Sequence, residues 1–181
     1  MQELYKETMR SIINKQGEGV YKKLNLSPGF DVEDTVRRLG GQLEICNSGE
    51  IEAGADAKIL PTYDGKNFKI LYEQSEVDAH TRFSIAHELG HLFLHMTRLD
   101  QDKSEYVISG DYKHVPRSSS MIEWEAEEFA AAFLMPESIF KIKAEEVSAN
   151  TTVQDKIQWL ADLFKVPYKS VVIRGENLGI W

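Results

Sequence analysis

One apolar stretch of the chain carries an unusual density of ionisable side chains, FSIAHELGHLFLH at residues 83–95. It contains the pattern His87-Glu88-x-x-His91. Because residues four apart share one face of a helix, the two imidazoles can bind the same metal ion. Glu88 follows the first histidine directly and could act as general base on a water molecule at that ion. The pattern is that of a zinc hydrolase, and it predicts His87 and His91 as Zn²⁺ ligands and Glu88 as the catalytic residue.

The same residues have a simpler interpretation, as polar side chains of an ordinary helix core. A single buried histidine is easily satisfied by one hydrogen bond. Two histidines and a glutamate in this order are harder to explain, because charged groups among apolar side chains are costly unless they are paired or bound to a metal. The apolar surroundings therefore favour the metal site.

A third metal ligand must come from elsewhere in the chain. His95 lies eight residues after His87, which is about 12 Å of helix and too far for both to hold one ion. Cys46 is the single cysteine and could be a ligand, but a lone cysteine is more often a small buried hydrophobe. A glutamate-rich segment, IEWEAEEFAAAFLMP at residues 122–136, is the better source.

The segment at residues 122–136 is expected to be a helix, and its four glutamates would face in different directions. Glu123 and Glu127 fall one turn apart at one edge of its apolar face, and Glu125 falls near the other edge. We favour Glu123 as the metal ligand, with Glu127 accepting the free N–H of a ligating histidine. Glu125 remains the alternative ligand. Glu128 points away from the apolar face and is expected to be a solvated surface charge.

Apolar periodicity and capping signals place the elements that must position these residues. They predict helices at residues 3–16, 32–39, 79–96, 119–135, 137–147 and 152–164, with a turn and helix after 167. They predict strands at residues 42–46, 57–63 and 67–73. Residues 97–118 are polar and irregular and are predicted to form a long loop.

Individual residues mark the ends of these elements. Gly17 and Gly19 are expected to end the first helix. Asp31 is expected to cap the second helix, and Thr151 or Thr152 the helix that starts near 152. An Asp-Gly pair at residues 64–65 is expected to turn a hairpin between the second and third strands.

The order of helices, a small sheet and more helices predicts an α+β fold. We expect a small, mostly antiparallel sheet packed on a helical core, zincin-like, followed by C-terminal helices. The chain shows no repeat and no linker, so it is expected to form a single domain over residues 1–181. Its parts would be N-terminal helices at 1–40, the sheet at 42–73, zinc-site helices at 79–147 and a C-terminal helical segment at 151–181.

Composition limits the classes of function. The chain has 181 residues and a formal net charge of −8, which argues against direct nucleic-acid binding, even by the C-terminal helices. One cysteine permits no internal disulfide and fits a reducing compartment. There is neither a signal-peptide pattern nor an apolar run of membrane-spanning length. The sequence therefore predicts a soluble, cytoplasmic protein with no membrane partner.

The two motifs RFSIAHELGHLFLH and EWEAEEFAAAFLMP together resemble the ImmA/IrrE family of small zinc metallopeptidases. The likeness covers roughly residues 80–181. It implies Zn²⁺ held by His87, His91 and Glu123, with Glu88 as the base. It also implies that the protein cleaves or inactivates a helix-turn-helix transcriptional regulator, in mobile-element, stress or toxin–antitoxin control. The family usually has Asn or Asp where this chain has Glu127, so a longer side chain would serve there.

Two other functions use some of the same residues. A zinc-stabilised binding module could sequester a regulator without cutting it, and it would not need Glu88. A deformylase-like hydrolase would use Cys46 as a metal ligand, although the sequence lacks the glycine-rich and cysteine-centred features of such a site. Three residues of the predicted loop are surface residues or candidates to stabilise an oxyanion: Tyr106, Tyr112 and His114.

Overall fold

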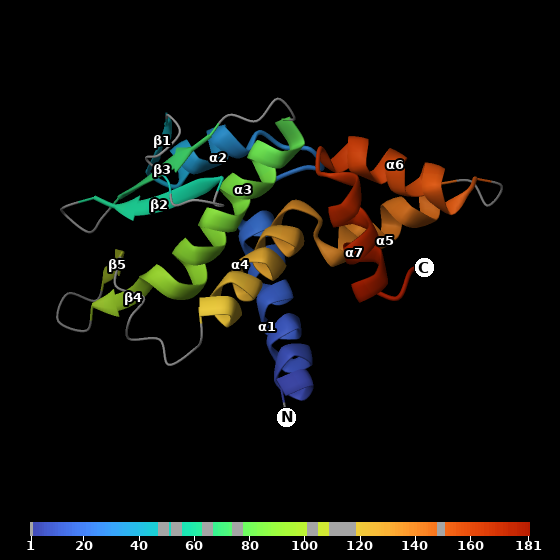
Figure 1. The fold of residues 1–181 in the computed structure, drawn as a ribbon, viewed down its shortest axis with the longest axis horizontal. Helices are drawn as coiled ribbons and strands as arrows, with labels where there is room; N and C mark the ends of the chain where they lie inside the picture. The colour runs from blue at the N-terminus through green and yellow to red at the C-terminus, as the bar shows by residue number, and fades with distance from the viewer. Residues whose placement is uncertain are drawn as a thin grey trace. The chain divides into compact units, whose positions relative to one another are not determined.

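The computed structural model describes residues 2–46, 51, 56–62, 67–73, 78–100, 105–108, 119–147 and 151–181. Its helices are α1 (Gln2–Lys23), α2 (Val32–Arg38), α3 (Asp78–His91), α4 (Ser119–Leu134), α5 (Glu137–Glu146), α6 (Val153–Phe164) and α7 (Tyr168–Asn177). A π-helical turn, η1 (Leu92–Met96), follows α3 directly. The strands are β1 (Gly41–Ile45), β2 (Ala57–Pro61), β3 (Phe68–Tyr72), β4 (Thr97–Asp100) and β5 (Glu105–Ile108) (Figure 1).

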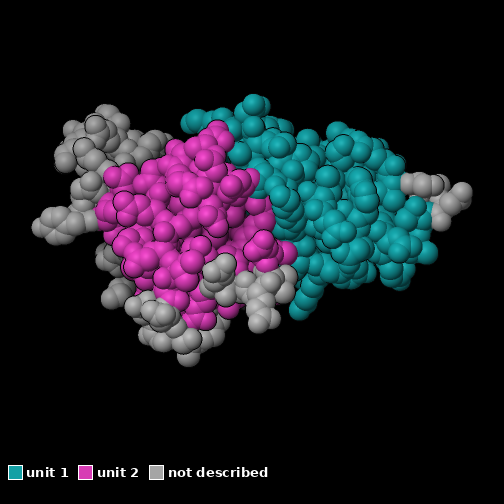
Figure 2. Space-filling view, turned by 90° about the horizontal axis from the view of Figure 1, so that it is seen from above, with its two compact units in different colours: residues 1–30, 128–181 teal, residues 31–127 magenta. Residues whose placement is uncertain are grey.

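The chain divides into two compact units. Unit 1 comprises Met1–Phe30 and Glu128–Trp181, and unit 2 comprises Asp31–Glu127; Figure 2 shows them in teal and magenta. Of the elements that the structure describes, unit 1 contains helices, whereas unit 2 contains the five strands together with α2, α3, η1 and the first part of α4. A single domain over residues 1–181 stays a prediction.

The sheet of unit 2 has the strand order β1-β3-β2. β1 pairs with β3 in parallel and β2 pairs with β3 antiparallel, so this sheet is mixed. Alternate side chains of β3 are buried, from Phe68 through Ile70 to Tyr72. α3 packs against β2 and β3, and α2 packs against β1 (Figure 1). The described helices together with this small sheet make an α+β fold, as the sequence predicted.

The predicted hairpin is present, and β2 lies at one edge of the sheet. Backbone bonds from Thr62 to Asn67 and from Glu73 to Asp56, both 2.9 Å, fix its register. Even-numbered residues of β2 therefore bond to β3, and odd-numbered residues turn their N–H and C=O groups outward. Pro61, which has no N–H, occupies such an outward position. The expected turn at residues 64–65 lies outside the described residues.

The first helix is longer than predicted. α1 continues through Gly17 and Gly19 to Lys23, so the expectation that these glycines end it was wrong. A Cβ added to Gly17 would lie 2.9 Å from the Cβ of Ala132 and 3.1 Å from the backbone nitrogen of Phe133. Gly17 is therefore the point at which α1 approaches α4 closely, and its lack of a side chain serves packing rather than helix termination.

The loop predicted at 97–118 contains two strands. β4 and β5 form an antiparallel pair in which Thr97 faces Ile108. Strand-forming residues are interspersed with charged ones here, which hid the alternation in the sequence. Residues 101–104 and 109–118, with Tyr112 and His114, lie outside the described residues.

The predicted N-caps are confirmed at two helices. A side-chain oxygen of Asp31 accepts the backbone N–H of Asp34 at 2.9 Å, and Thr152 does the same for Asp155 at 3.1 Å. Each satisfies an N–H that has no partner within its helix.

Among the described helices, none has both the length and the apolar character needed to cross a membrane.

Candidate metal centre

Helix α3 carries its histidines opposite a closely packed apolar face. Ile85, Ala86 and Leu89 are 0–1% exposed and fix the apolar face of the helix against its surroundings. One turn separates His87 from His91, so their rings lie next to each other, with centroids 4.8 Å apart. Packing of the apolar face thus places both imidazoles on the side of α3 that meets α4.

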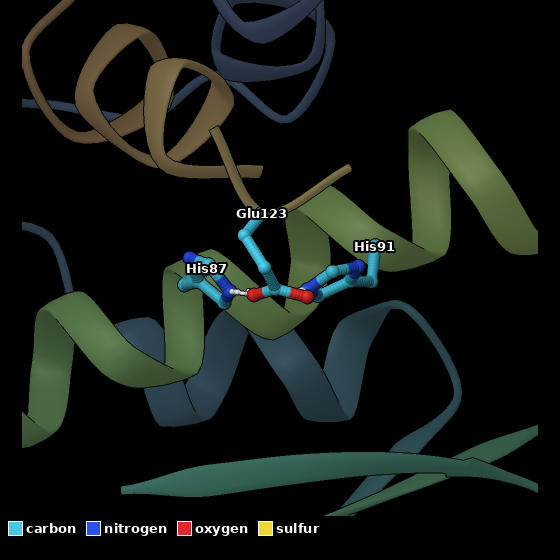
Figure 3. Close-up of side chains that lie close together, drawn as sticks. All are labelled: His87, His91 and Glu123. Atoms are coloured by element: carbon cyan, nitrogen blue, oxygen red, sulfur yellow. Dashed lines mark hydrogen bonds and ion pairs between the residues drawn. The ribbon is translucent and has the colours of Figure 1, made fainter. Parts of the chain in front are cut away.

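Three side-chain atoms converge between α3 and α4 (Figure 3). Nε2 of His87 lies 3.0 Å from Oε2 of Glu123 and 3.0 Å from Nε2 of His91. Nε2 of His91 lies 3.4 Å from the same oxygen of Glu123. Ligands of a tetrahedral zinc ion, each 2.0–2.1 Å from the metal, are roughly 3.3 Å from one another. The group of His87, His91 and Glu123 could therefore hold a metal ion.

A glycine allows the two helices to approach closely enough for this convergence. A Cβ added to Gly90 would lie 2.8 Å from the backbone oxygen of Ala126 and 2.9 Å from its Cα. Both contacts are with backbone atoms, so α4 would have to move to make room. Gly90 is thus the packing residue that lets Glu123 reach the histidines of α3.

The charges of the three residues are set by one another and by burial. Burial alone would lower the pKa of His87, but hydrogen bonding to Glu123 and the charge of Glu88 raise it above its ordinary value. Burial and the nearby His87 lower the pKa of His91 to about 4. The hydrogen bond to His87 lowers the pKa of Glu123. At neutral pH the group therefore offers an ionised carboxylate and a neutral His91, both of which can bind a cation.

Glu88 is buried beside this group and is fixed by a backbone contact. Its Oε2 accepts the N–H of Ile59 at 2.8 Å, one of the outward-facing groups of β2. Burial raises the pKa of Glu88 above its ordinary value, although the charge of His87 and the bond from Ile59 oppose the shift. A carboxylate with a raised pKa is better suited to take up a proton near neutral pH.

Glu125, the alternative third ligand, lies elsewhere. Its Oε2 lies 3.1 Å from Nε2 of His95, and their side chains are 1% and 0% exposed. Glu123, not Glu125, is the carboxylate next to His87 and His91. Sequence reasoning missed the pairing of Glu125 with His95. The available signal was the position of His95 one turn after His91.

The remaining glutamates of α4 have other surroundings. Glu127 is exposed, and its effect on His87 is the electrostatic one of a nearby negative charge. Glu128 is buried, and its Oε1 accepts a hydrogen bond of 2.9 Å from Nε of Arg10. The expectation that Glu128 is a solvated charge was wrong, because α4 is buried on more than one side along this part of its length.

Two further candidates have no place in the three-atom group. Cys46 is buried just after β1 and belongs to no metal-binding group among the described residues. Tyr106 lies on β5, where its backbone pairs with Leu99.

Comparison with known proteins gives a family and a related fold. The model of the IrrE N-terminal-like domain, Peptidase_M78, matches residues 60–175. The solved structure of a Mycobacterium tuberculosis transcriptional regulator is similar, with a TM-score of 0.56 and 18% sequence identity. The similarity covers 90% of this chain but 46% of that one, so this chain spans less than half the length of the regulator. No curated protein matches the chain.

Proposed function

The chain belongs to the IrrE N-terminal-like (Peptidase_M78) family, and from this premise we propose that it is a zinc-dependent endopeptidase that cleaves a helix-turn-helix transcriptional regulator. The family suggests a metallopeptidase. The observation that carries the proposal is the convergence of Nε2 of His87, Nε2 of His91 and Oε2 of Glu123. Glu88, adjacent in sequence to His87, supplies the base that hydrolysis requires.

His87, His91 and Glu123 would hold the metal. Two imidazoles and one carboxylate are a ligand set of catalytic zinc sites, which leave one position open. When bound, zinc supplies Lewis acidity, which makes water acidic enough to attack a peptide bond at neutral pH. The low pKa of His91, about 4, keeps that ring unprotonated and available as a ligand.

Glu88 would move the proton during hydrolysis. It would take a proton from the attacking water and pass it to the nitrogen of the departing amine. The bond from Ile59 to Oε2 holds the carboxylate in place by one oxygen, so the other oxygen can carry the proton. The raised pKa of Glu88 brings both steps closer to neutral pH.

The proposed substrate is supported by the family resemblance and by the charge of the chain. A net charge of −8 suits a basic partner, and DNA-binding proteins carry clustered Lys and Arg. A regulator that acts on DNA places the reaction in the cytoplasm. We propose no direct contact between this chain and nucleic acid.

The test is cleavage of a candidate regulator by the purified protein with added zinc. A helix-turn-helix regulator encoded beside this gene is the first substrate to try. We expect cleavage by the wild type, and a loss of roughly 10²–10⁴-fold in rate for Glu88→Gln, which removes the base. Glu145→Gln, an exposed change on α5, is the matched control and should cleave normally.

The same variants separate proteolysis from sequestration. If the zinc-loaded protein binds the regulator without cutting it, and Glu88→Gln relieves repression in cells as well as the wild type does, the endopeptidase proposal is wrong. The protein would then be a zinc-stabilised binding module.

A further inference from the structure

A row of hydrogen-bonded, buried side chains starts at His91 and leads away from the three-atom group. Nδ1 of His91 lies 3.1 Å from Nδ1 of His95. Nε2 of His95 lies 3.1 Å from Oε2 of Glu125. The side chains of His95 and Glu125 are 0% and 1% exposed. His91, His95 and Glu125 thus form a continuous hydrogen-bonded path whose far end is a buried carboxylate.

The direction of these hydrogen bonds follows from the number of protons available. A neutral imidazole has one N–H and one acceptor nitrogen, and a carboxylate only accepts. When His95 is neutral, its Nε2 donates to Glu125, which leaves its Nδ1 as the acceptor. Nδ1 of His91 must then donate, and Nε2 of His91 keeps its lone pair. That nitrogen is the one that lies 3.0 Å from His87 and 3.4 Å from Glu123.

We propose that His95 and Glu125 are positioning residues, which hold His91 in the tautomer whose Nε2 carries a lone pair and can bind the metal. This inference rests on the proposed function, because the tautomer of His91 matters only if Nε2 is a ligand. If the acceptor at His95 were lost, His91 could carry its proton on Nε2 instead, where it would block the metal. Partners that fix the tautomer of a ligating histidine usually contact it directly; here a second histidine lies between the ligand and the carboxylate.

The turn that contains His95 and the packing around it fix the position of the His95 ring. His95 belongs to η1, the π-helical turn that follows α3 and precedes β4. Leu92 and Met96, on either side of it in the turn, are 5% and 1% exposed. The ring of His95 is therefore held by packing as well as by its two hydrogen bonds.

A purely structural pair would behave differently from a positioning pair. Buried polar groups form hydrogen bonds wherever they occur, and loss of a structural partner would lower stability alone. Glu128 provides the matched comparison. It lies on the same helix as Glu125, its side chain is 8% exposed, and it bonds to Arg10 rather than to a histidine.

The first test is ¹⁵N NMR of the histidine side chains in the metal-free wild type at mildly alkaline pH. The shifts of the ring nitrogens show which nitrogen carries the proton. We expect N–H at Nδ1 of His91 and at Nε2 of His95. A proton on Nε2 of His91 would overturn the proposal, and this result requires no variant to fold.

The second test compares Glu125→Ala with Glu128→Ala, using zinc affinity measured against a competing chelator and the same NMR signals. We expect Glu125→Ala to lose roughly 10–100-fold in zinc affinity and to shift His91 toward the other tautomer. Glu125→Gln, whose amide oxygen still accepts a hydrogen bond, should recover part of the loss. Glu128→Ala should change neither property, even if it lowers stability.

The outcomes distinguish this proposal from the proposed function. If Glu125→Ala binds zinc like the wild type and keeps the same His91 tautomer, the positioning role is wrong and the metal site stands. If the wild type binds no zinc, the proposed function fails, and the His91 tautomer in the wild type compared with Glu125→Ala still decides whether Glu125 sets the proton on His91.

Discussion

Each compact unit holds a polar cluster, and the two clusters differ in how their polar atoms are arranged. In unit 1, Arg174 is 1% exposed. It donates from Nε to the carbonyl of Met135 at 3.1 Å and from Nη1 to Oδ1 of Asn14 at 2.6 Å. Arg10 donates to Glu128 in the same way. Each of these contacts joins a donor to an acceptor.

The cluster of unit 2 instead brings three atoms that can bind a metal close to one another. The two Nε2 atoms of His87 and His91 and the carboxylate of Glu123 can each offer a lone pair to the same point. Burial shifts the pKa in both clusters, to about 10 for Arg174 and to about 4 for His91. A shifted pKa therefore does not distinguish the two clusters, whereas among the described residues only the group of unit 2 brings together ligand atoms that could hold one metal ion.

Removing one of the converging acceptors should have the largest effect. We expect Glu123→Ala to lose more zinc affinity than the 10–100-fold typical of an outer partner, because it removes a ligand. Chelator competition measures the loss, and Glu145→Ala on α5 is the control. If Glu123→Ala binds zinc as tightly as the wild type, Glu123 is not a metal ligand.

Breaking the cluster of unit 1 should affect stability and leave the metal site unchanged. Arg174→Met removes the donors to Met135 and Asn14, and we expect it to lower the free energy of unfolding by about 2–4 kcal/mol. Denaturant titration gives the change. The exposed Arg37, 3.9 Å from Glu33, is the control, and Arg37→Met should cost less than about 1 kcal/mol. A loss of zinc affinity in folded Arg174→Met would contradict the contrast between the clusters.

Gly90 and Gly19 allow the effect of close helix packing on stability to be distinguished from the effect of helix propensity. Gly90→Ala would push a Cβ against the backbone of Ala126, and we expect a cost of about 1–3 kcal/mol in stability together with weaker zinc binding. Gly19, whose added Cβ would meet nothing within 4 Å, is the control. Gly19→Ala should stabilise α1 by about 0.5–1 kcal/mol. Equal effects at the two positions would refute the packing role of Gly90.

The smallest effect concerns pH. The pKa of His87 lies above its ordinary value of 6.5, so as the pH falls through it, His87 takes up a proton that zinc must displace. Apparent zinc affinity should therefore fall with decreasing pH, by up to about tenfold per unit for one proton. His91, with its pKa of about 4, adds no second proton near neutrality. Affinity that is constant across neutral pH would contradict this assignment.

Local features of the fold followed directly from the sequence. Asp31 and Thr152 cap their helices as predicted, and the hairpin of β2 and β3 has the predicted strands. These features depend on neighbouring residues, which a sequence displays. Gly17 was misread because a glycine that ends a helix and a glycine that lets another helix approach look alike in sequence. Gly19 also lies inside α1, but an added Cβ would meet nothing within 4 Å, so no packing contact explains it.

The metal site likewise has one part that local sequence determines and one part that depends on tertiary contacts. The sequence by itself placed His87, Glu88 and His91 on one helix, because the spacing of residues along a helix is fixed by its geometry. Which carboxylate joins them depends on the rotation and distance of α4 relative to α3, and contact at Gly90 sets that distance. The sequence favoured Glu123 over Glu125 as the third ligand, and tertiary structure brings Glu123 to the two histidines, Glu125 to His95 and the N–H of Ile59 to Glu88, since each contact joins segments far apart in the chain.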